Sequence, residues 1–183
     1  AVGRDSLYSL TTGESHVAIG ENAGYSITTG NNTVAVGKLA LYANTGNDNT
    51  ALGHQTLQAN TTGTSNVAVG RDALNDNTTS SYNVAVGAYA LAKNTTGTNN
   101  TALGYSALYD NATTSYNTAI GYEALGNNLA DYNTAVGRQC MVSNTTGSRN
   151  TAIGNRSLYT NTTGDYNTSL GDHAMSASST SNN

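Results

Sequence analysis

Residues 100–109 read Asn-Thr-Ala-Leu-Gly-Tyr-Ser-Ala-Leu-Tyr, and an Asn/Thr-rich segment follows them. The same pattern recurs along the chain at a spacing of 17 residues, shortened to 16 before Gly53 and Gly137. Its glycine occurs at Gly3, Gly20, Gly37, Gly53, Gly70, Gly87, Gly104, Gly121, Gly137, Gly154 and Gly171. A fixed period this short indicates the stacked coils of a solenoid and not a globular domain.

The three residues before each glycine predict a short β-strand. A medium-sized residue, an alanine and a second medium-sized residue follow one another, as in Val84, Ala85 and Val86. This period of two places the alanine on one face and its neighbours on the other, so both faces are apolar. Because a single coil has only one interior, we expect alanine to point inward. The Val/Ile/Leu face then needs a cover from outside the coil, which predicts a homo-oligomer.

A small and a larger apolar residue follow the glycine, as in Ala107 and Leu108, and predict a second short strand. Between the two strands we expect the glycine to adopt a positive φ or to allow a close chain approach. The Asn/Thr-rich turn then absorbs the residue that the 16-residue repeats lack. The predicted fold is all-β, a parallel β-roll or β-solenoid.

Stacked coils bring equivalent residues above one another, and an asparagine stands four residues before most of the glycines. Side-chain amides in such a column hydrogen-bond to one another along the axis of a cross-β stack. We therefore predict a structural ladder that comprises Asn66, Asn83, Asn100, Asn117, Asn133, Asn150 and the glycines Gly70, Gly87, Gly104, Gly121, Gly137 and Gly154.

The pattern predicts one uninterrupted array of about eleven repeats over residues 1–175, as counted from the recurring glycine, with degenerate N-terminal repeats over 1–32. The Ser/Asn-rich residues 176–183 predict a tail or linker.

Charge and hydropathy exclude two classes of partner. The net charge is −4, and the seven Lys and Arg residues are scattered, so no basic face for nucleic acid is expected. No apolar run approaches the roughly 18 residues that span a bilayer, so we expect no direct membrane insertion. Cys140 is the single cysteine and takes a position where other repeats carry alanine or serine, which predicts a small buried residue.

Residues that carry catalysis do not recur in any fixed arrangement. His16, His54 and His173 have no partner at metal-ligand spacing. No Gly-x-Ser-x-Gly segment occurs in a strand-turn-helix context, and the acidic residues form no positioned pair. We therefore expect no catalytic residue, no metal site and no cofactor, and predict that the chain is not an enzyme.

Two sets of turn residues are candidates for contact with other molecules. Tyr82, Tyr116, Tyr132 and Tyr166 share one loop position, where their rings either bind a ligand such as a sugar or pack on one another. Asn-x-Ser/Thr sequences make candidate glycosylation sites of Asn60, Asn77, Asn94, Asn111, Asn144 and Asn161 if the source glycosylates its proteins.

The strings His16-Val17-Ala18-Ile19-Gly20, Asn66-Val67-Ala68-Val69-Gly70 and Asn83-Val84-Ala85-Val86-Gly87 resemble the head repeat of YadA-like trimeric autotransporter adhesins. The longer pattern, with its Asn-Thr-Thr-Gly turn, also resembles repeats of phage tail fibre and bacterial surface proteins. This resemblance covers nearly the whole chain, although the repeats here are longer than the usual adhesin head repeat. It implies a left-handed parallel β-roll, three chains packed along a common axis, and a role in surface attachment.

The leading functional hypothesis is a non-enzymatic, fibrous attachment module of a phage tail fibre or bacterial adhesin. It would space or bind a cell-surface glycan or polymer and act outside the cell, on a cell surface or a virion. The first alternative is a purely structural subunit of an extracellular filament or stalk. The second is an ice-binding solenoid with a flat threonine array, although Ala112 and Leu129 interrupt that array.

Overall fold

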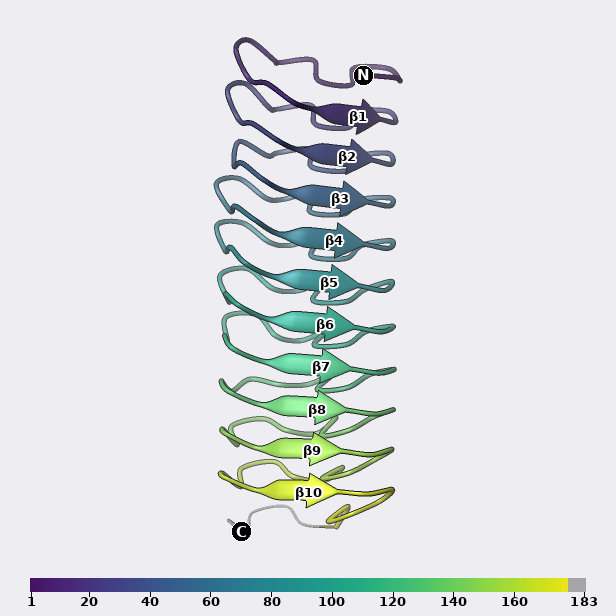
Figure 1. Ribbon diagram of the computed structural model, residues 1–183, viewed down its shortest axis with the longest axis vertical. Helices are drawn as coiled ribbons and strands as arrows, with labels where there is room; N and C mark the ends of the chain where they lie inside the picture. The colour runs from purple at the N-terminus through teal and green to yellow at the C-terminus, as the bar shows by residue number, and fades with distance from the viewer. Residues whose placement is uncertain (178–183) are drawn as a thin grey trace.

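The computed structural model describes residues 1–177 and forms a single stack of coils. Each coil after the first contributes one three-residue strand, and all strands point the same way (Figure 1). They are β1 (Val17–Ile19), β2 (Val34–Val36), β3 (Thr50–Leu52), β4 (Val67–Val69), β5 (Val84–Val86), β6 (Thr101–Leu103), β7 (Thr118–Ile120), β8 (Thr134–Val136), β9 (Thr151–Ile153) and β10 (Thr168–Leu170). The prediction of an all-β parallel β-solenoid is confirmed.

The ten strands form one parallel sheet in sequence order, and the sequence repeat sets its register. Ala85 of β5 lies between Ala68 of β4 and Ala102 of β6, one coil away on either side. In the first coil, Val2 joins the sheet by an isolated bridge to Ile19. Equivalent residues of successive coils therefore stand in columns along the rod.

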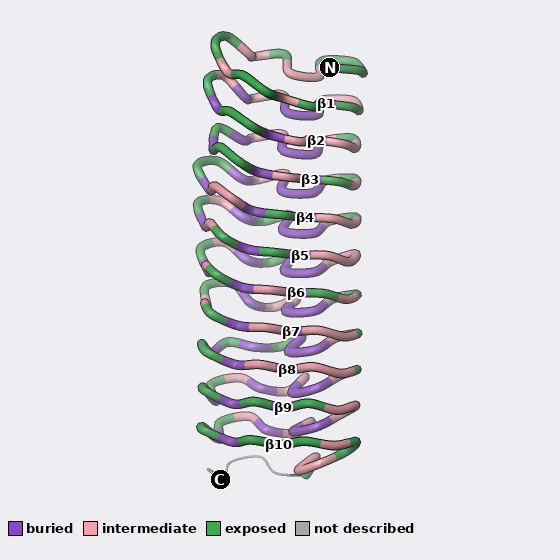
Figure 2. Tube along the Cα trace, in the orientation of Figure 1, coloured by how far each residue is buried: buried purple, intermediate pink, exposed green. Residues whose placement is uncertain are grey.

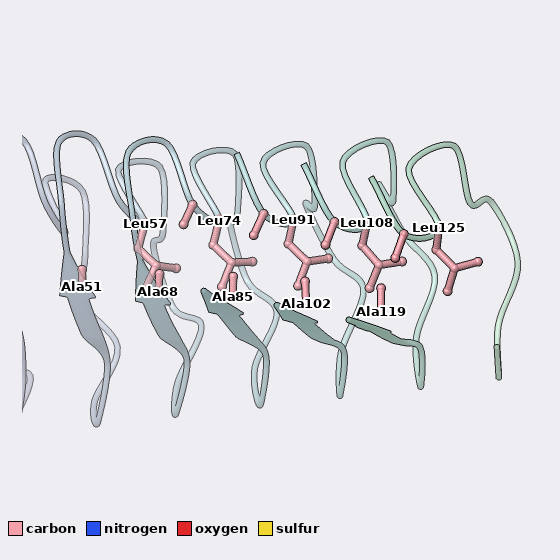
Figure 3. Close-up of a cluster of buried hydrophobic side chains, with 14 of the residues drawn as sticks. Ala51, Leu57, Ala68, Leu74, Ala85, Leu91, Ala102, Leu108, Ala119 and Leu125 are labelled. Carbon is pink, nitrogen blue, oxygen red and sulfur yellow. The ribbon is translucent and has the colours of Figure 1, made fainter. Parts of the chain in front are cut away.

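The interior of the rod lies between the sheet and the segment that returns behind it. Figure 3 shows alanines of the strands facing leucines of this return segment. Ala85, Ala102, Leu91 and Leu108 have no exposed surface, and the same two columns continue along the stack. Figure 2 shows buried purple segments at the same places in successive coils, with exposed green segments at the outer turns and along several of the strands.

The return segment is not the second strand that the sequence predicted. Within residues 1–177 only β1 to β10 are strands, and the return segment is a series of turns. Tyr89 and Leu91 have φ values of 60° and 51°, far from the extended region. A left-handed leucine costs about 1–2 kcal/mol, which complete burial of its side chain, worth about 1.5–3 kcal/mol, offsets.

Backbone hydrogen bonds hold these turns to the coils on both sides. The N–H of Tyr89 donates to the carbonyl of Arg71 in the preceding coil, at 2.9 Å, and the N–H of Leu91 donates to Ala107 in the following coil, at 3.0 Å. The two left-handed residues thus point their amides in opposite directions along the rod. Inter-coil bonding continues through the return segment although no strand forms there.

The recurring glycines meet both requirements predicted for them. Gly70 has a φ of 121°, and a Cβ added there would lie 2.7 Å from the carbonyl carbon and oxygen of Gly87. Any side chain would therefore push adjacent coils apart. The shortened repeats lose their residue in the Asn/Thr-rich turn, as expected: Asn44 Nδ2 donates to the carbonyl two residues later, at Gly46, whereas Asn60 bonds three residues later, at Gly63.

The expected C-terminal tail falls only in part within the described residues. The carbonyl of Ser176 accepts a hydrogen bond from the N–H of Thr160, so residue 176 continues the last turn. The rest of the expected tail, from residue 178 onward, lies outside the described residues.

Candidate functional site

The outer strand face consists of the residues one and three positions before each recurring glycine. Its side chains point away from the interior, and the exposure of its most exposed apolar members ranges from 36% at Val67 to 78% at Leu170. The central residue of the same strands is buried throughout, as predicted, with alanine at every strand except β10, where Ser169 is 4% exposed. A single chain therefore leaves an apolar stripe uncovered along the whole sheet.

The predicted asparagine column forms a strand ladder, named here for its position beside the strands. Asn66 Oδ1 accepts the backbone N–H of Asn83 at 3.0 Å, and Asn83 Oδ1 accepts that of Asn100 at 2.9 Å. The Nδ2 of Asn83 donates to the carbonyl of Gly97 at 2.9 Å, in the turn that leads to Asn100 of the next coil. The ladder is confirmed, but it bonds chiefly to the backbone and only secondarily from amide to amide.

A second column, which we call the turn ladder, has the amide-to-amide bonding that was expected of the first. Asn77 Nδ2 donates to Asn60 Oδ1 at 2.7 Å, and Asn94 Nδ2 donates to Asn77 Oδ1 at 3.0 Å. Each Nδ2 also closes its own turn, as Asn94 does on the Gly97 carbonyl at 3.0 Å. The column comprises Asn44, Asn60, Asn77, Asn94, Asn111, Asn128, Asn144 and Asn161, all with no exposed surface.

All six candidate glycosylation sites are members of this turn ladder. A glycan is attached through Nδ2, and in the folded coil that atom is buried and donates hydrogen bonds to neighbouring rungs. The burial of Asn60, Asn77, Asn94, Asn111, Asn144 and Asn161 therefore argues against glycosylation of the folded chain. The sequence signal for this role was their strict recurrence, which persists at Asn128 where the Thr-Thr-Gly motif is lost.

The four candidate tyrosines line one exposed edge of the rod. Tyr116 and Tyr132 stack in parallel with ring centroids 5.0 Å apart. Arg149 Cζ then lies 5.3 Å from the Tyr132 ring centroid and 5.6 Å from that of Tyr166. Tyr116, Tyr132, Arg149 and Tyr166 thus form a continuous tyrosine ridge on successive coils, whereas Tyr82 is separated from it by Asn99.

The backbone at the ridge position has a left-handed conformation, which is unfavourable for tyrosine. Tyr116 and Tyr132 have φ values of 61° and 62°. Asn32 and Asn99 occupy the same position in other coils, and asparagine tolerates this conformation much better. Tyr166 is 62% exposed, so little burial compensates the cost. Stacking between rings supports the packing alternative, while the exposed ring surface keeps the binding alternative open.

Cys140 and His16 both have hydrogen-bond partners within the stack. The Cys140 thiol is fully buried and donates to the Ala152 carbonyl at 3.3 Å, and burial raises its pKa to about 12. It is thus protonated near neutral pH and is the small buried residue that was expected. His16 is half-buried and its Nδ1 lies 2.7 Å from Thr33 Oγ1. No group of three His, Cys, Asp or Glu side chains within residues 1–177 could hold a metal ion.

A second cluster of tyrosines lies on the return segment, and it was not identified from the sequence. Tyr89 and Tyr105 come from successive coils, with ring centroids 5.8 Å apart in an edge-to-face arrangement. Tyr89 also meets Tyr109 edge to face at 6.4 Å. Their positions in the repeat differ, so no column relates them. The available signal was that Tyr89 and Tyr105 lie 16 residues apart, close to one coil.

Among the described residues no helix is long and apolar enough to cross a bilayer. Comparison of the chain with protein-family models, with curated proteins and with solved structures gives no match. A functional proposal for this chain therefore rests on its columns and surfaces.

Proposed function

We propose that this chain is a segment of a homotrimeric, left-handed β-roll fibre that acts outside the cell as a non-enzymatic attachment module. The apolar outer strand face carries the proposal. The residue directly before the glycine is Val, Ile or Leu in all ten strands, and such a stripe along a whole sheet is typical of a surface that another chain covers.

The size of this stripe is sufficient to support association. Ile19, Leu52 and Leu103 each keep almost half of their surface exposed. Burying the remainder of one such side chain would stabilise the assembly by roughly 1 kcal/mol. The five members of the column that keep almost half of their surface exposed, or more, would together contribute roughly 5 kcal/mol per chain; they are Ile19, Leu52, Leu103, Ile153 and Leu170. This gain is comparable with the lower end of the cost of association, about 4–15 kcal/mol. The trimeric state and the left-handed winding of the β-roll are proposed from the resemblance to adhesin heads.

The surfaces of the rod that a trimer would leave in contact with solvent support a role in attachment. If sister chains cover the strand face, the turns and the return segment remain in contact with solvent, and they carry the tyrosine ridge and the second tyrosine cluster. Aromatic side chains on a rigid scaffold lose little entropy when they bind a ligand. The proposed receptor is a cell-surface glycan or polymer. The chain that binds it would be a segment of a phage tail fibre or of a bacterial adhesin.

The native mass tests the assembly. We expect light scattering after size exclusion to give about three times 18.7 kDa. Leu103→Lys with Ile120→Lys would place repelling charges on the strand face and lower the mass to one chain. The matched pair Thr62→Lys and Thr96→Lys, on exposed turns, would leave it unchanged. A single-chain mass for the native protein would overturn the trimer, and masses that grow with concentration would favour the filament alternative.

Attachment is tested separately, by applying labelled native protein to an array of bacterial and animal cell-surface glycans. Binding to at least one polymer is the expected result. A trimer that binds none of them would favour the purely structural role.

A further inference from the structure

The second tyrosine cluster borders a hollow on the return segment. Its lining includes Tyr89, Tyr105 and Tyr109 together with Glu123, Gly126 and Asn127, which belong to the coil after that of Tyr109. The hollow has a volume of about 550 Å³ and is open to solvent. This volume lies within the range of sites that hold small organic ligands.

The hollow exists because one column lacks a large side chain. The position five residues after the recurring glycine carries tyrosine in five coils, at Tyr8, Tyr25, Tyr42, Tyr109 and Tyr159. Gly126 stands there between Tyr109 and Val142. Backbone geometry does not demand this glycine, since its φ lies outside the left-handed region. A Cβ at Gly126 would lie 3.4 Å from both Val142 Cγ2 and the Glu123 carbonyl, which the fold tolerates.

The walls combine ring surfaces with hydrogen-bonding groups. The Tyr89 ring is inclined by 81° to Tyr105 and by 75° to Tyr109, so the rings of the lining lie in different planes. Tyr105 stacks on Tyr122 with ring centroids 5.4 Å apart. The Glu123 carboxylate accepts a hydrogen bond from Gln139 Nε2 at 2.9 Å, and a carboxylate has about four acceptor positions in all. Ser106 and Asn127 add a hydroxyl and an amide to the lining.

The two cations nearby are already paired, and the Glu123 carboxylate bonds to the neutral amide of Gln139. The hollow therefore offers no free cation to an anionic ligand, and it offers hydrogen-bond acceptors to a hydroxylated one. Lys93 Nζ lies 2.6 Å from Asp110 and 4.7 Å from the Tyr109 ring centroid. Arg71 lies 4.6 Å from the Tyr89 ring centroid and 3.4 Å from Asp72. A cationic ligand would be repelled by Lys93 and Arg71, and an anionic ligand would be repelled by Glu123. A neutral ligand with apolar C–H groups on one face and hydroxyls on its rim suits rings bordered by acceptors.

We propose that this hollow binds one neutral pyranose residue. Its C–H groups pack on the tyrosine rings, and its hydroxyls donate to Glu123 and bond to Asn127. The inference rests on the proposed attachment function and places the specific receptor contact in the hollow, whereas the tyrosine ridge is a separate surface. The regular columns repeat along the rod, but the hollow occurs where the column breaks, so it supplies a discrete site.

Saturation-transfer NMR with four probes tests this proposal: the methyl glycosides of glucose, galactose, mannose and N-acetylglucosamine. At least one probe should receive saturation from the native protein. Gly126→Tyr restores a ring that other coils carry and fills the hollow, so we expect the affinity to fall at least about tenfold, with an unchanged melting temperature. Tyr105→Ala should lower the affinity about tenfold by removing one ring.

Gln58→Tyr is the matched control, because it introduces the same side chain at the same repeat position, four coils away. It should leave glycoside binding unchanged. The absence of binding by all four glycosides, or full binding by Gly126→Tyr, would overturn the proposal. Binding of tetramethylammonium in place of the glycosides would also overturn it, in favour of a cation site.

The outcomes separate this inference from the proposed function. If the native protein binds the glycan array and Gly126→Tyr binds it equally well, attachment stands and the hollow is not its site. If the glycosides bind in the hollow but the native mass is that of one chain, the site stands and the trimer does not.

Discussion

Asn94→Asp tests whether the turn ladder holds the coils together. The change replaces an NH₂ group by an oxygen and leaves the shape of the side chain almost the same. Asn94 Nδ2 donates to Asn77 Oδ1 at 3.0 Å, Ser80 Oγ at 2.9 Å and the Gly97 carbonyl at 3.0 Å. A carboxylate there would face two carbonyl oxygens, of the Asn77 side chain and of Gly97, and a Ser80 hydroxyl that already donates to Asn77 Oδ1. It would also have no exposed surface from which water could solvate its charge.

The size of the loss in the free energy of unfolding depends on whether the introduced carboxyl group is protonated. The introduced side chain, when protonated, keeps one donor of two, so at about pH 4 we expect a loss of about 1 kcal/mol in the free energy of unfolding. At about pH 7 the buried group must retain its proton about three units above its unfolded pKa of about 3.9, which adds about 4 kcal/mol. Because the folded-state pKa is raised, stability falls as the pH rises from the unfolded pKa toward the folded one.

Melting temperatures by circular dichroism at the two pH values provide the measurement. Asn99→Asp is the control, since it makes the same chemical change at an exposed turn residue and should have little effect at either pH. A loss for Asn94→Asp that does not grow with pH, or that equals the loss for Asn99→Asp, would refute the buried ladder.

Three further variants or reagents examine the packing of the coils. Ala102→Leu should overpack the interior and cost about 1–3 kcal/mol, whereas Thr98→Leu on the turn should be near neutral; equal melting temperatures would show that the faces are wrongly placed. Gly70→Ala should destabilise the stack by more than about 1 kcal/mol, because its Cβ would meet the Gly87 carbonyl, while Gly126→Ala should have no measurable effect on the melting temperature. With a pKa of about 12, about one Cys140 thiol in ten thousand is ionised at about pH 8, so a thiol reagent should label Cys140 only under unfolding conditions; rapid labelling of the native protein would contradict its burial.

The sequence predicted those features of the coil that depend on period alone. The inward alanines, the positive-φ glycines and the asparagine column beside the strands all follow from a 17-residue repeat and the size of the side chain. The return segment could not be predicted in the same way. An alternation such as Ala107-Leu108 fits a strand, and only the coil geometry reveals that Leu108 is left-handed and bonds to the neighbouring coil from within a turn.

The roles of the turn asparagines were hidden by a second interpretation of the same residues. Asn94-Thr95-Thr96 satisfies the pattern of a glycosylation site, and the turn composition indicates an exposed loop. Burial depends on the closing of the turn over its own asparagine, through the bond to the Gly97 carbonyl, which composition does not express. The hollow was equally hidden, because it requires residues from different columns to meet.

The contrast between the uniform interior columns and the variable outer column explains where such a rod can acquire binding specificity. Interior columns must be nearly uniform, because each alanine, leucine or asparagine packs against or bonds to its own copies on both sides, and one odd member disturbs two interfaces. The column five residues after the glycine has no such constraint: successive coils carry Tyr42, Gln58, Asn75, Ala92, Tyr109 and Gly126. A ligand that contacts only uniform columns would find many equivalent positions along the rod. A break such as Gly126 distinguishes one position from the others, so binding specificity in a solenoid of this kind is expected where a variable column loses a side chain.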